Sequence, residues 1–460
     1  MIKKFPYQQL LYATLLAAAM TACNKFVDVP LPNNQITTAA AFGDDGKANS
    51  SMRGIYASTQ NVWSQGPLSG LLSTSFGLAS DELVRLSYSA DQQNFLDNNL
   101  TATSEGAASI WSGFYNMLYQ INVLLENVQK SPGISAPVKQ QLTGEACFLR
   151  AYCYFYMVNT FGDVPLSLTS DYRVNAILGR TPADKVYEQI LTDLASAQAQ
   201  AGDQYTTAGN RLRANKWAAT AMLARVQLYR KNWTEAEKQA GNVIQSGLYQ
   251  LDSLNNVFLI SSKEAILQIA NPGTNKYTME INRLTGNATN PSCRFSHYLS
   301  AAFEKDDQRI TRWTLKASNG DTAYYKYQVN DNNNPKTEAL TLLRLAEQYL
   351  IRAEARAWQG KLQEAIADLD VVRKRAGITL LANTSPGISK EELLQAIAKE
   401  RMTELFGEQG HRWFDVKRSG LADALYSIRK PNWNKNAILL PIPRNERLKN
   451  PNLTQNEGYE

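Results

Sequence analysis

The densest group of side chains that could carry out acid–base chemistry lies near residue 410. It combines two arginines and two acids with three aromatic rings: Arg401, Glu404, Arg412, Asp415, Phe406, Trp413 and Phe414. Cleavage of a glycosidic bond would need two carboxylates, one on either side of the bond. Buried charges are normally paired with opposite charges, so we interpret the group as a structural ion-pair network at a helix end. The sequence therefore predicts no catalytic residue in this group.

Cysteine and histidine offer no metal site or redox pair. The chain has four cysteines and two histidines: Cys23, Cys147, Cys153, Cys293, His297 and His411. No CxxC pair occurs, and neither histidine has a second metal ligand at a useful spacing. Cys147 and Cys153 are six residues apart in a helical stretch, so they point to different faces and cannot form a disulfide. We predict three buried free thiols, no bound metal and no cofactor; Cys23 is a separate case.

The first residues predict a lipid anchor. Lys3 and Lys4 precede an apolar stretch, Leu10 to Met20, that is too short to cross a bilayer. The stretch ends at Cys23 in a Met-Thr-Ala-Cys sequence that resembles the lipobox of bacterial lipoproteins, where the cysteine receives acyl chains such as palmitate. We therefore predict a signal peptide over residues 1–22, lipidation of Cys23, and a tether rich in Pro and Asn over residues 24–38.

Composition excludes some classes of protein. The chain has 460 residues, 44% of them hydrophobic, which is enough for a large core. The net charge is +6, and removal of the signal peptide with Lys3 and Lys4 would lower it to +4, a small charge for a chain of this length. No basic stripe accompanies this charge, so nucleic-acid binding is not expected. No stretch after the signal peptide is apolar enough to cross a membrane, so we expect a water-soluble body.

Helical periodicity dominates from about residue 40. Residues 109–129 place apolar side chains on one helical face, and residues 138–161 form a second long helix that ends at Gly162. A third helix is predicted from Thr181, as N-cap, to Gln200. A fourth starts at Ser389 with the capping residue Glu392 and reaches residue 406.

Two further segments resemble tetratricopeptide helix pairs. The first joins residues 214–230 to residues 234–246, with Thr234 and Glu237 as a predicted capping box. The second joins residues 339–359 to residues 362–375. Small Ala residues at the contact positions would let the helices of each pair approach closely. Between residues 251 and 336 the periodicity weakens, and we predict loops and short hairpins, with strands at 265–269 and 324–328.

Six segments in a fixed order resemble the SusD/RagB family of outer-membrane lipoproteins. Residues 161–166 have the sequence Phe-Gly-Asp-Val-Pro-Leu, which is similar to a signature of that family. The six segments cover nearly the whole mature chain; they are residues 149–166, 215–219, 343–355, 374–377, 400–415 and 440–456.

The resemblance implies a fold and a function. The fold would be mainly α, a SusD-like helical body with tetratricopeptide-like helix pairs and a loop-rich variable face with short β-hairpins. Residues 23–250 would form an N-terminal region and residues 251–460 a C-terminal region, packed together as one compact body. The protein would bind a glycan on the outer face of the outer membrane, act as the lid of a SusC-like TonB-dependent transporter, and catalyse nothing.

Ligand contacts in this family come from the first third of the chain and from the variable segment. Flat rings match the C–H faces of sugars, while charged and amide side chains satisfy hydroxyl groups. The candidate ligand-binding residues are Asp81, Glu82, Arg85, Tyr88, Trp313, Tyr324 and Tyr325.

Three other functions are compatible with these features. An oligopeptide could replace the glycan as ligand in the same family. A periplasmic scaffold of tetratricopeptide type could share the helix pairs. A glycan-degrading lipoprotein would need a pair of carboxylates in a cleft, and the sequence does not point to one.

Overall fold

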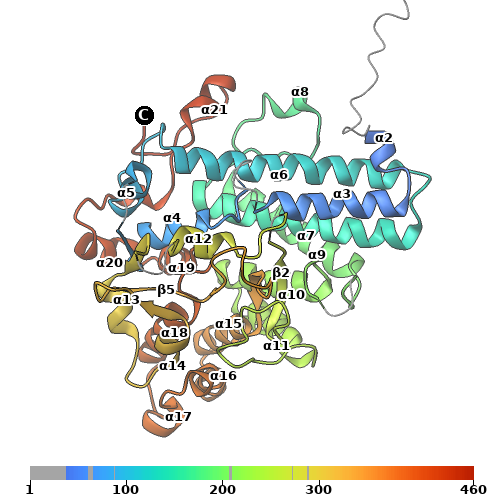
Figure 1. Cartoon of the computed structure of the whole chain (residues 1–460). Helices are drawn as coiled ribbons and strands as arrows, with labels where there is room; N and C mark the ends of the chain where they lie inside the picture. Colours follow the sequence, from blue (N-terminus) through green and yellow to red (C-terminus); the bar gives the residue numbers. More distant parts are fainter. Residues whose placement is uncertain (1–37, 61–65, 87–88, 207–209, 272, 287–289) are drawn as a thin grey trace, which may run out of the picture.

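The computed structural model describes residues 38–60, 66–86, 89–206, 210–271, 273–286 and 290–460. The described chain is mainly helical, with a few short strands (Figure 1). The mainly α fold class predicted from the sequence is therefore confirmed. Neither the predicted signal peptide nor Cys23 falls within the described residues.

Long helices form the upper layer in Figure 1. They are α3 (Asp45–Ser58), α6 (Glu105–Lys130), α7 (Ala136–Phe161) and α9 (Ala183–Gln200). Helix α6 buries one apolar stripe, as its periodicity predicts. Helix α7 is buried along almost its whole length from Leu142 onward because other helices surround it. It ends at Gly162, whose φ of 72° suits a residue without a side chain.

The two predicted helix pairs join into one stack. The first pair is α10 (Lys216–Tyr229) with α11 (Trp233–Gln245), and the second is α15 (Leu345–Trp358) with α16 (Leu362–Ala376). Helix α11 packs on α15, and α18 (Lys390–Leu405) packs on both α15 and α16. Fully buried alanines such as Ala221 and Ala353 line these contacts, so the helices can lie close together.

One of the three predicted helix N-caps is confirmed, and the other two are wrong. Ser389 and Glu392 form the predicted capping box. Thr181 is not the N-cap of α9; the carboxylate of Asp163 instead accepts a hydrogen bond from the Ala183 backbone N–H at 2.8 Å. The predicted box at Thr234 is also wrong, because α11 starts one residue earlier and lacks a side-chain cap.

Three small antiparallel sheets complete the fold. Strand β2 (Ala265–Ile269) pairs with β6 (Leu340–Arg344), β1 (Leu83–Arg85) with β3 (Cys293–Phe295), and β4 (Thr314–Lys316) with β5 (Thr322–Tyr324). The strand predicted at 265–269 is confirmed. Residues 340–344 were expected to begin a helix and are instead a fully buried strand. The strand predicted at 324–328 lies earlier, at β5.

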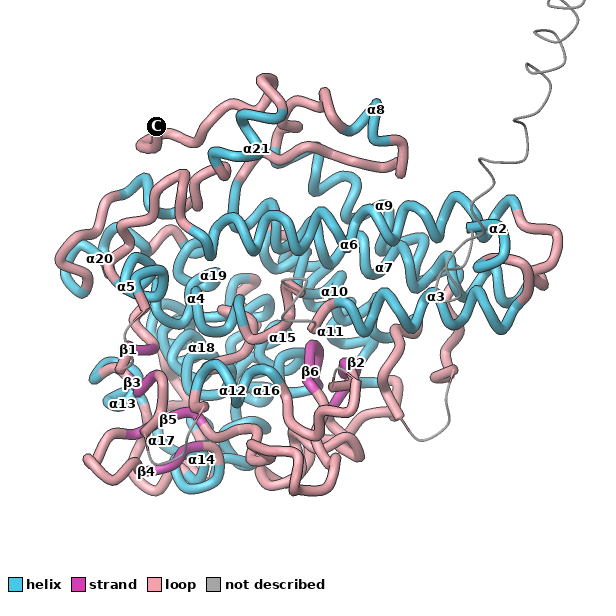
Figure 2. Tube along the Cα trace, turned by 45° about the horizontal axis from the view of Figure 1, so that its top comes forward, coloured by secondary structure: helices cyan, strands magenta, loops and turns pink. Residues whose placement is uncertain are grey.

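Shorter helices connect these parts, as Figure 2 shows. They are α2 (Thr38–Ala41), α4 (Leu71–Ala79), α5 (Ala90–Leu96), α8 (Tyr172–Asn175), α12 (Met279–Leu284), α13 (His297–Ala302), α14 (Gln308–Arg312), α17 (Leu381–Thr384), α19 (His411–Ser419), α20 (Ala422–Arg429), the 3-10 helix η1 (Lys435–Ile438) and α21 (Arg444–Lys449).

The charged group near residue 410 is an ion-pair network, as predicted. Arg401 binds both oxygens of Asp415 at 2.7 and 3.0 Å. Glu404 is fully buried and pairs with Arg309 at 3.0 Å and with Arg344 at 2.5 Å. The cysteines of the described chain, Cys147, Cys153 and Cys293, are buried and free.

Candidate functional site

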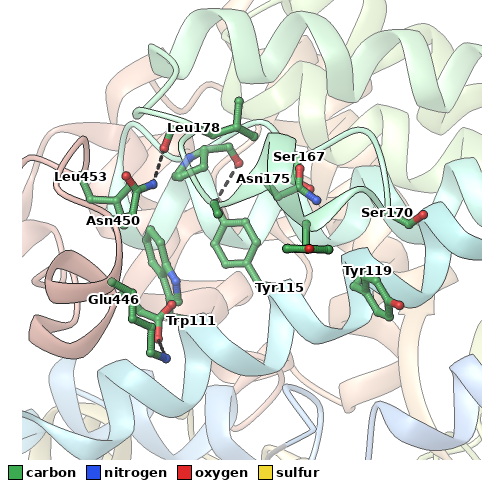
Figure 3. A pocket seen from close by; sticks show the side chains of 14 residues that line it. Trp111, Tyr115, Tyr119, Ser167, Ser170, Asn175, Leu178, Glu446, Asn450 and Leu453 are labelled. Carbon is green, nitrogen blue, oxygen red and sulfur yellow. Dashed lines mark hydrogen bonds and ion pairs between the residues drawn. The ribbon is translucent and has the colours of Figure 1, made fainter. Parts of the chain in front are cut away.

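A row of three aromatic rings runs along α6. Trp111, Tyr115 and Tyr119 are four residues apart, so their side chains share one face of the helix. The Trp111 and Tyr115 rings pack with centroids 4.9 Å apart. The Tyr115 hydroxyl donates a 2.8 Å hydrogen bond to the Pro165 carbonyl, which fixes the ring against the neighbouring loop (Figure 3).

The loop that carries α8 and the short helix α21 form the other walls. Asn175 donates to the Thr169 carbonyl at 2.7 Å and thereby closes the α8 loop on itself. Asn450 donates to the Leu178 carbonyl at 2.8 Å, which ties the end of α21 to this loop. Segments near residues 115, 172 and 448 are therefore brought to one place by the fold.

These walls enclose an aromatic cavity of about 380 Å³. Its lining residues are Trp111, Tyr115, Tyr119, Pro165, Ser167, Ser170, Tyr172, Asn175, Ala176, Leu178, Glu446, Lys449, Asn450 and Leu453. Trp111 is buried at the floor, whereas Tyr119 and Tyr172 are 55% and 77% exposed. Exposed rings beside a concave surface can stack on a ligand without any rearrangement of the core.

A second, polar cavity of about 540 Å³ adjoins the first. The two cavities share Glu446 and Lys449, and the second is lined by residues 102–112 of α6 and its preceding loop and by residues 443–449. We call the two cavities together the α21 groove. One half of this groove offers rings and the other offers hydroxyl, amide and charged groups, which suits an amphipathic ligand such as an oligosaccharide.

Electrostatics keep the buried hydroxyl of the groove neutral. Burial raises the pKa of Tyr115 well above its ordinary value, so this hydroxyl keeps its proton and its hydrogen bond to Pro165. Behind the cavity wall, Glu126 accepts hydrogen bonds from the hydroxyl groups of Ser170 and Thr169. Burial acts to raise the pKa of Glu126, but these hydrogen bonds outweigh it and hold that pKa below its ordinary value.

The structure places four of the predicted ligand residues in the interior. Trp313 is 1% exposed and donates its indole N–H to the Leu254 carbonyl at 2.8 Å. Tyr324 is equally buried and packs against Phe406. Trp313 and Tyr324 are predicted as ligand residues because they are aromatic and lie in the variable segment. In the structure both rings fill the core instead. They present no face to a ligand in this conformation.

Asp81 and Glu82 are also buried. Asp81 accepts two hydrogen bonds from Arg412, at 2.7 and 2.9 Å, and contacts Arg429. Burial acts to raise the pKa of Asp81, but the two arginines outweigh it and lower that pKa. Both carboxylate oxygens of Glu82 are buried without a hydrogen-bond partner. Neither carboxylate reaches the surface, in contrast to what ligand binding would require.

The remaining predicted residues lie outside the groove. Arg85 is half-buried and donates to the Gln93 side chain at 2.9 Å. Tyr325 is half-buried and lines neither cavity. Tyr88 is not among the described residues. For these three residues a role in ligand binding stays a prediction.

The sequence shows the spacing of the aromatic row but does not mark it as a ligand site. Helix α6 packs against the core through an apolar stripe formed by Ile110, Phe114, Met117 and Leu118. Trp111, Tyr115 and Tyr119 form a second stripe beside this apolar one. The sequence could not show that α8 and α21 close over this second stripe. Within the described ranges, no group of His, Cys, Asp and Glu side chains could hold a metal ion, and no helix is both long and apolar enough to cross a membrane.

Comparison with known proteins gives a consistent assignment. A family model described as SusD family matches residues 268–459, and one described as starch-binding associating with outer membrane matches residues 48–228. SusD-like protein P25 of Formosa agariphila is 25% identical over 423 residues, which cover 76% of this chain and 79% of that protein. The starch-binding protein SusD of Bacteroides thetaiotaomicron is 31% identical over 163 residues, 34% of this chain and 26% of that protein.

Solved structures share the fold over nearly the whole chain. A SusD superfamily protein from Bacteroides vulgatus aligns with a TM-score of 0.80 at 21% identity, covering 90% of this chain and 99% of that one. A laminarin-binding SusD-like protein aligns with a TM-score of 0.73 at 26% identity, covering 91% of this chain and 100% of that one.

Proposed function

The chain belongs to the SusD/RagB family, and from this premise we propose that it is a glycan-binding lipoprotein of the outer membrane. The α21 groove is the proposed binding site. The observation that carries this proposal is the row of rings on α6, which ends in the exposed Tyr119 and is continued by the exposed Tyr172, beside a polar cavity. Relatives named for starch and laminarin binding support a glycan as the ligand.

The ring faces and the polar half of the groove have separate roles. The exposed faces of Tyr119 and Tyr172 would cover the apolar C–H face of a sugar and remove it from water. Side chains at the junction of the two cavities, such as Glu446 and Lys449, would bind the hydroxyl groups. Binding of this kind needs no bond cleavage, and we propose that the protein has no enzyme activity. Release of reducing sugars from polysaccharides at enzyme-like rates would contradict this part.

We further propose that a SusC-like TonB-dependent transporter is the partner and that this chain is its lid on the cell surface. Large apolar side chains are exposed around the groove, with Ile177 68% and Leu448 72% accessible. Exposed apolar side chains grouped in one region commonly mark a protein interface. Purification of the tagged native chain from solubilised outer membranes tests this proposal, because a lid should bring a TonB-dependent barrel with it.

The binding site is tested by titration calorimetry of the full chain in detergent with laminarin and starch oligosaccharides. Truncation of a ring at the centre of a binding site commonly costs about 2 kcal/mol, so Tyr172→Ala and Tyr119→Ala should each weaken binding roughly tenfold or more. Trp358→Ala is the matched control, since Trp358 is an exposed ring on the helix-pair stack. All three variants should keep the native circular dichroism spectrum.

Affinities that are unchanged in both tyrosine variants, for every glycan that the native chain binds, would show that the ligand lies elsewhere on the surface. The predicted residues Arg85, Tyr88 and Tyr325 would then be the next positions to change.

A further inference from the structure

We infer that the aromatic cavity selects uncharged, hydroxyl-rich glycans over glycans that carry carboxylate or sulfate groups. This inference rests on the proposed function, because it concerns the ligand class of the same groove. It follows from how the hydrogen-bond donors and acceptors of the cavity wall are already used.

Several polar side chains in the inner wall of the cavity already donate hydrogen bonds to the protein itself. The Tyr115 hydroxyl donates to the Pro165 carbonyl at 2.8 Å, and the Ser170 hydroxyl donates to Glu126 at 2.5 Å. One N–H of the Asn450 amide donates to the Leu178 carbonyl at 2.8 Å. A hydroxyl has one proton but two lone pairs, so the oxygens of Tyr115 and Ser170 remain able to accept hydrogen bonds but not to donate them.

Asn175 adds a buried acceptor with no partner. Its amide nitrogen donates to the Thr169 carbonyl at 2.7 Å, while its Oδ1 atom is buried without a hydrogen bond. The opposite amide orientation would place Oδ1 against the Thr169 carbonyl oxygen, so the hydrogen bond fixes the orientation. An unsatisfied buried acceptor favours a ligand that brings an O–H or N–H group to it.

The ionised groups point in the same direction. Glu446 lines the cavity, and Glu126 lies directly behind Ser170 in its wall. Lys449 is the cation that lines the aromatic cavity, and it is already paired with Glu446 at 2.8 Å, whereas Arg444 lines only the adjoining polar cavity. Apart from the exposed hydroxyls of Tyr119 and Tyr172, an anionic sugar in the aromatic cavity would lose its hydration and meet mainly acceptors and acids. A neutral sugar would supply the donors that these acceptors lack.

Matched ligands test this inference. The full chain in detergent is titrated with laminarin, amylose and galactan oligosaccharides, each alongside the same material oxidised at C6 to the uronate. A carboxylate that meets acceptors instead of donors should bind roughly tenfold or more weakly, as expected for unpaired polar groups in a binding site. Glu446→Gln should reduce this discrimination, while the matched control Glu188→Gln, on the exposed face of α9, should not change it.

Different results would contradict the inferred selectivity and the proposed binding site. If the oxidised glycans bind as tightly as the neutral ones and Tyr172→Ala still weakens both, the inferred selectivity is wrong and the proposed site stands. If neither Tyr119→Ala nor Tyr172→Ala affects any glycan, the proposed site itself is wrong. If Glu446→Gln leaves a large discrimination unchanged, the acidic groups do not contribute to it, which also contradicts the inference as stated.

Discussion

Arg344 shows how this protein keeps buried charge in its core. Its guanidinium binds Glu264 at 2.9 Å and Glu408 at 2.8 Å, and Glu408 also accepts from Lys326 at 2.6 Å. All four side chains are buried. Mutual pairing offsets the cost of removing these charges from water, so we regard the network as structural and not as a set of acid–base catalysts.

Glu82 is the contrasting case, because it is buried without a hydrogen-bond partner. Burial raises its pKa to about 8, although the nearby Lys326 ammonium acts to lower it. The side chain is therefore largely protonated at neutral pH in the folded protein. In the unfolded chain its pKa returns to the ordinary value of 4.5, so the folded state holds the extra proton between these two pH values.

This difference predicts a pH dependence of stability. The contribution of Glu82 to the free energy of unfolding should fall as the pH rises from about 4.5 to about 8, by up to about 1.4 kcal/mol per pH unit. Glu82→Gln removes the titrating group, so the variant should gain stability relative to the native chain as the pH rises. Denaturant unfolding at pH 5, 6.5 and 8 measures this gain, with Glu188→Gln as an exposed control. Parallel curves for the variant and the native chain would contradict the assignment.

Strand β6 shows how tertiary contacts decide the type of an element. Leu340–Arg344 contains three leucines and could extend the helix that follows it. In the structure all five residues are buried and the strand pairs with β2, which is more than 70 residues earlier in the chain. A short apolar run does not distinguish helix from strand, and the partner strand is not visible in the local sequence.

The helix caps provide a test at the same scale. Ser389→Ala removes the hydrogen bond from the Glu392 backbone N–H to the serine hydroxyl, 3.2 Å long, and should destabilise the protein by about 1 kcal/mol. Thr234→Ala should change stability by less than about 0.5 kcal/mol, because α11 has no side-chain cap. Denaturant midpoints of the two variants make the comparison. Equal losses would mean that the Thr234 hydroxyl caps α11 in solution after all.

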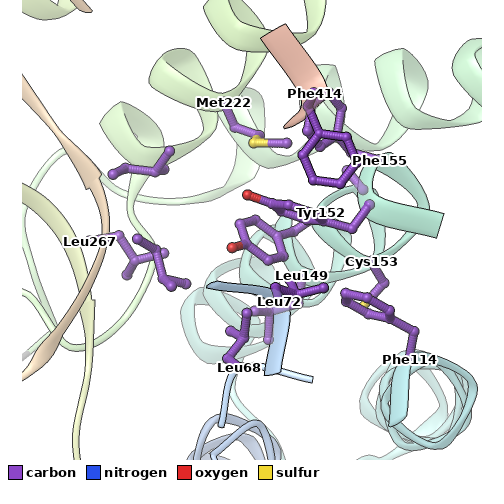
Figure 4. Close-up of a cluster of buried hydrophobic side chains, with 14 of the residues drawn as sticks. Leu68, Leu72, Phe114, Leu149, Tyr152, Cys153, Phe155, Met222, Leu267 and Phe414 are labelled. Atoms are coloured by element: carbon purple, nitrogen blue, oxygen red, sulfur yellow. The ribbon is translucent and has the colours of Figure 1, made fainter. Parts of the chain in front are cut away.

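At the scale of the whole molecule, one core joins the two halves of the chain. Figure 4 shows Leu72 and Phe114 together with Met222, Leu267 and Phe414 in one cluster of buried side chains. Both halves of the chain also form the groove, since α6 lines its floor and α21, near the end of the chain, lines the opposite wall. A ligand site of this kind depends on the complete body being folded.

The proposed anchor lies outside this core and can be tested separately. Two or more acyl chains hold a protein stably on a membrane. Cys23→Ala should therefore release the protein into the soluble fraction, while its unfolding midpoint stays unchanged, because the described core begins at Phe42. Cys147→Ala is the control and should remain with the membranes. A Cys23→Ala protein that sediments with washed outer membranes would show that another feature holds it there.

Local signals in the sequence were enough to identify the family, the long helices, the two helix pairs, the Ser389 cap and the ion pairs near Asp415. Periodicity and caps act within a few turns of one helix, so they can be read without knowing the fold. Local patterns could not show which aromatic rings are buried and which are exposed. Trp313 and Tyr324 became core residues, while Tyr119 and Tyr172 stayed exposed.

Only the tertiary structure decided where the groove lies. Its walls come from α6, the α8 loop and α21, and the last of these is more than 260 residues from the α8 loop. Whether an aromatic side chain is buried or exposed depends on which distant segment packs over it, and a pattern within one helix carries no information about that segment.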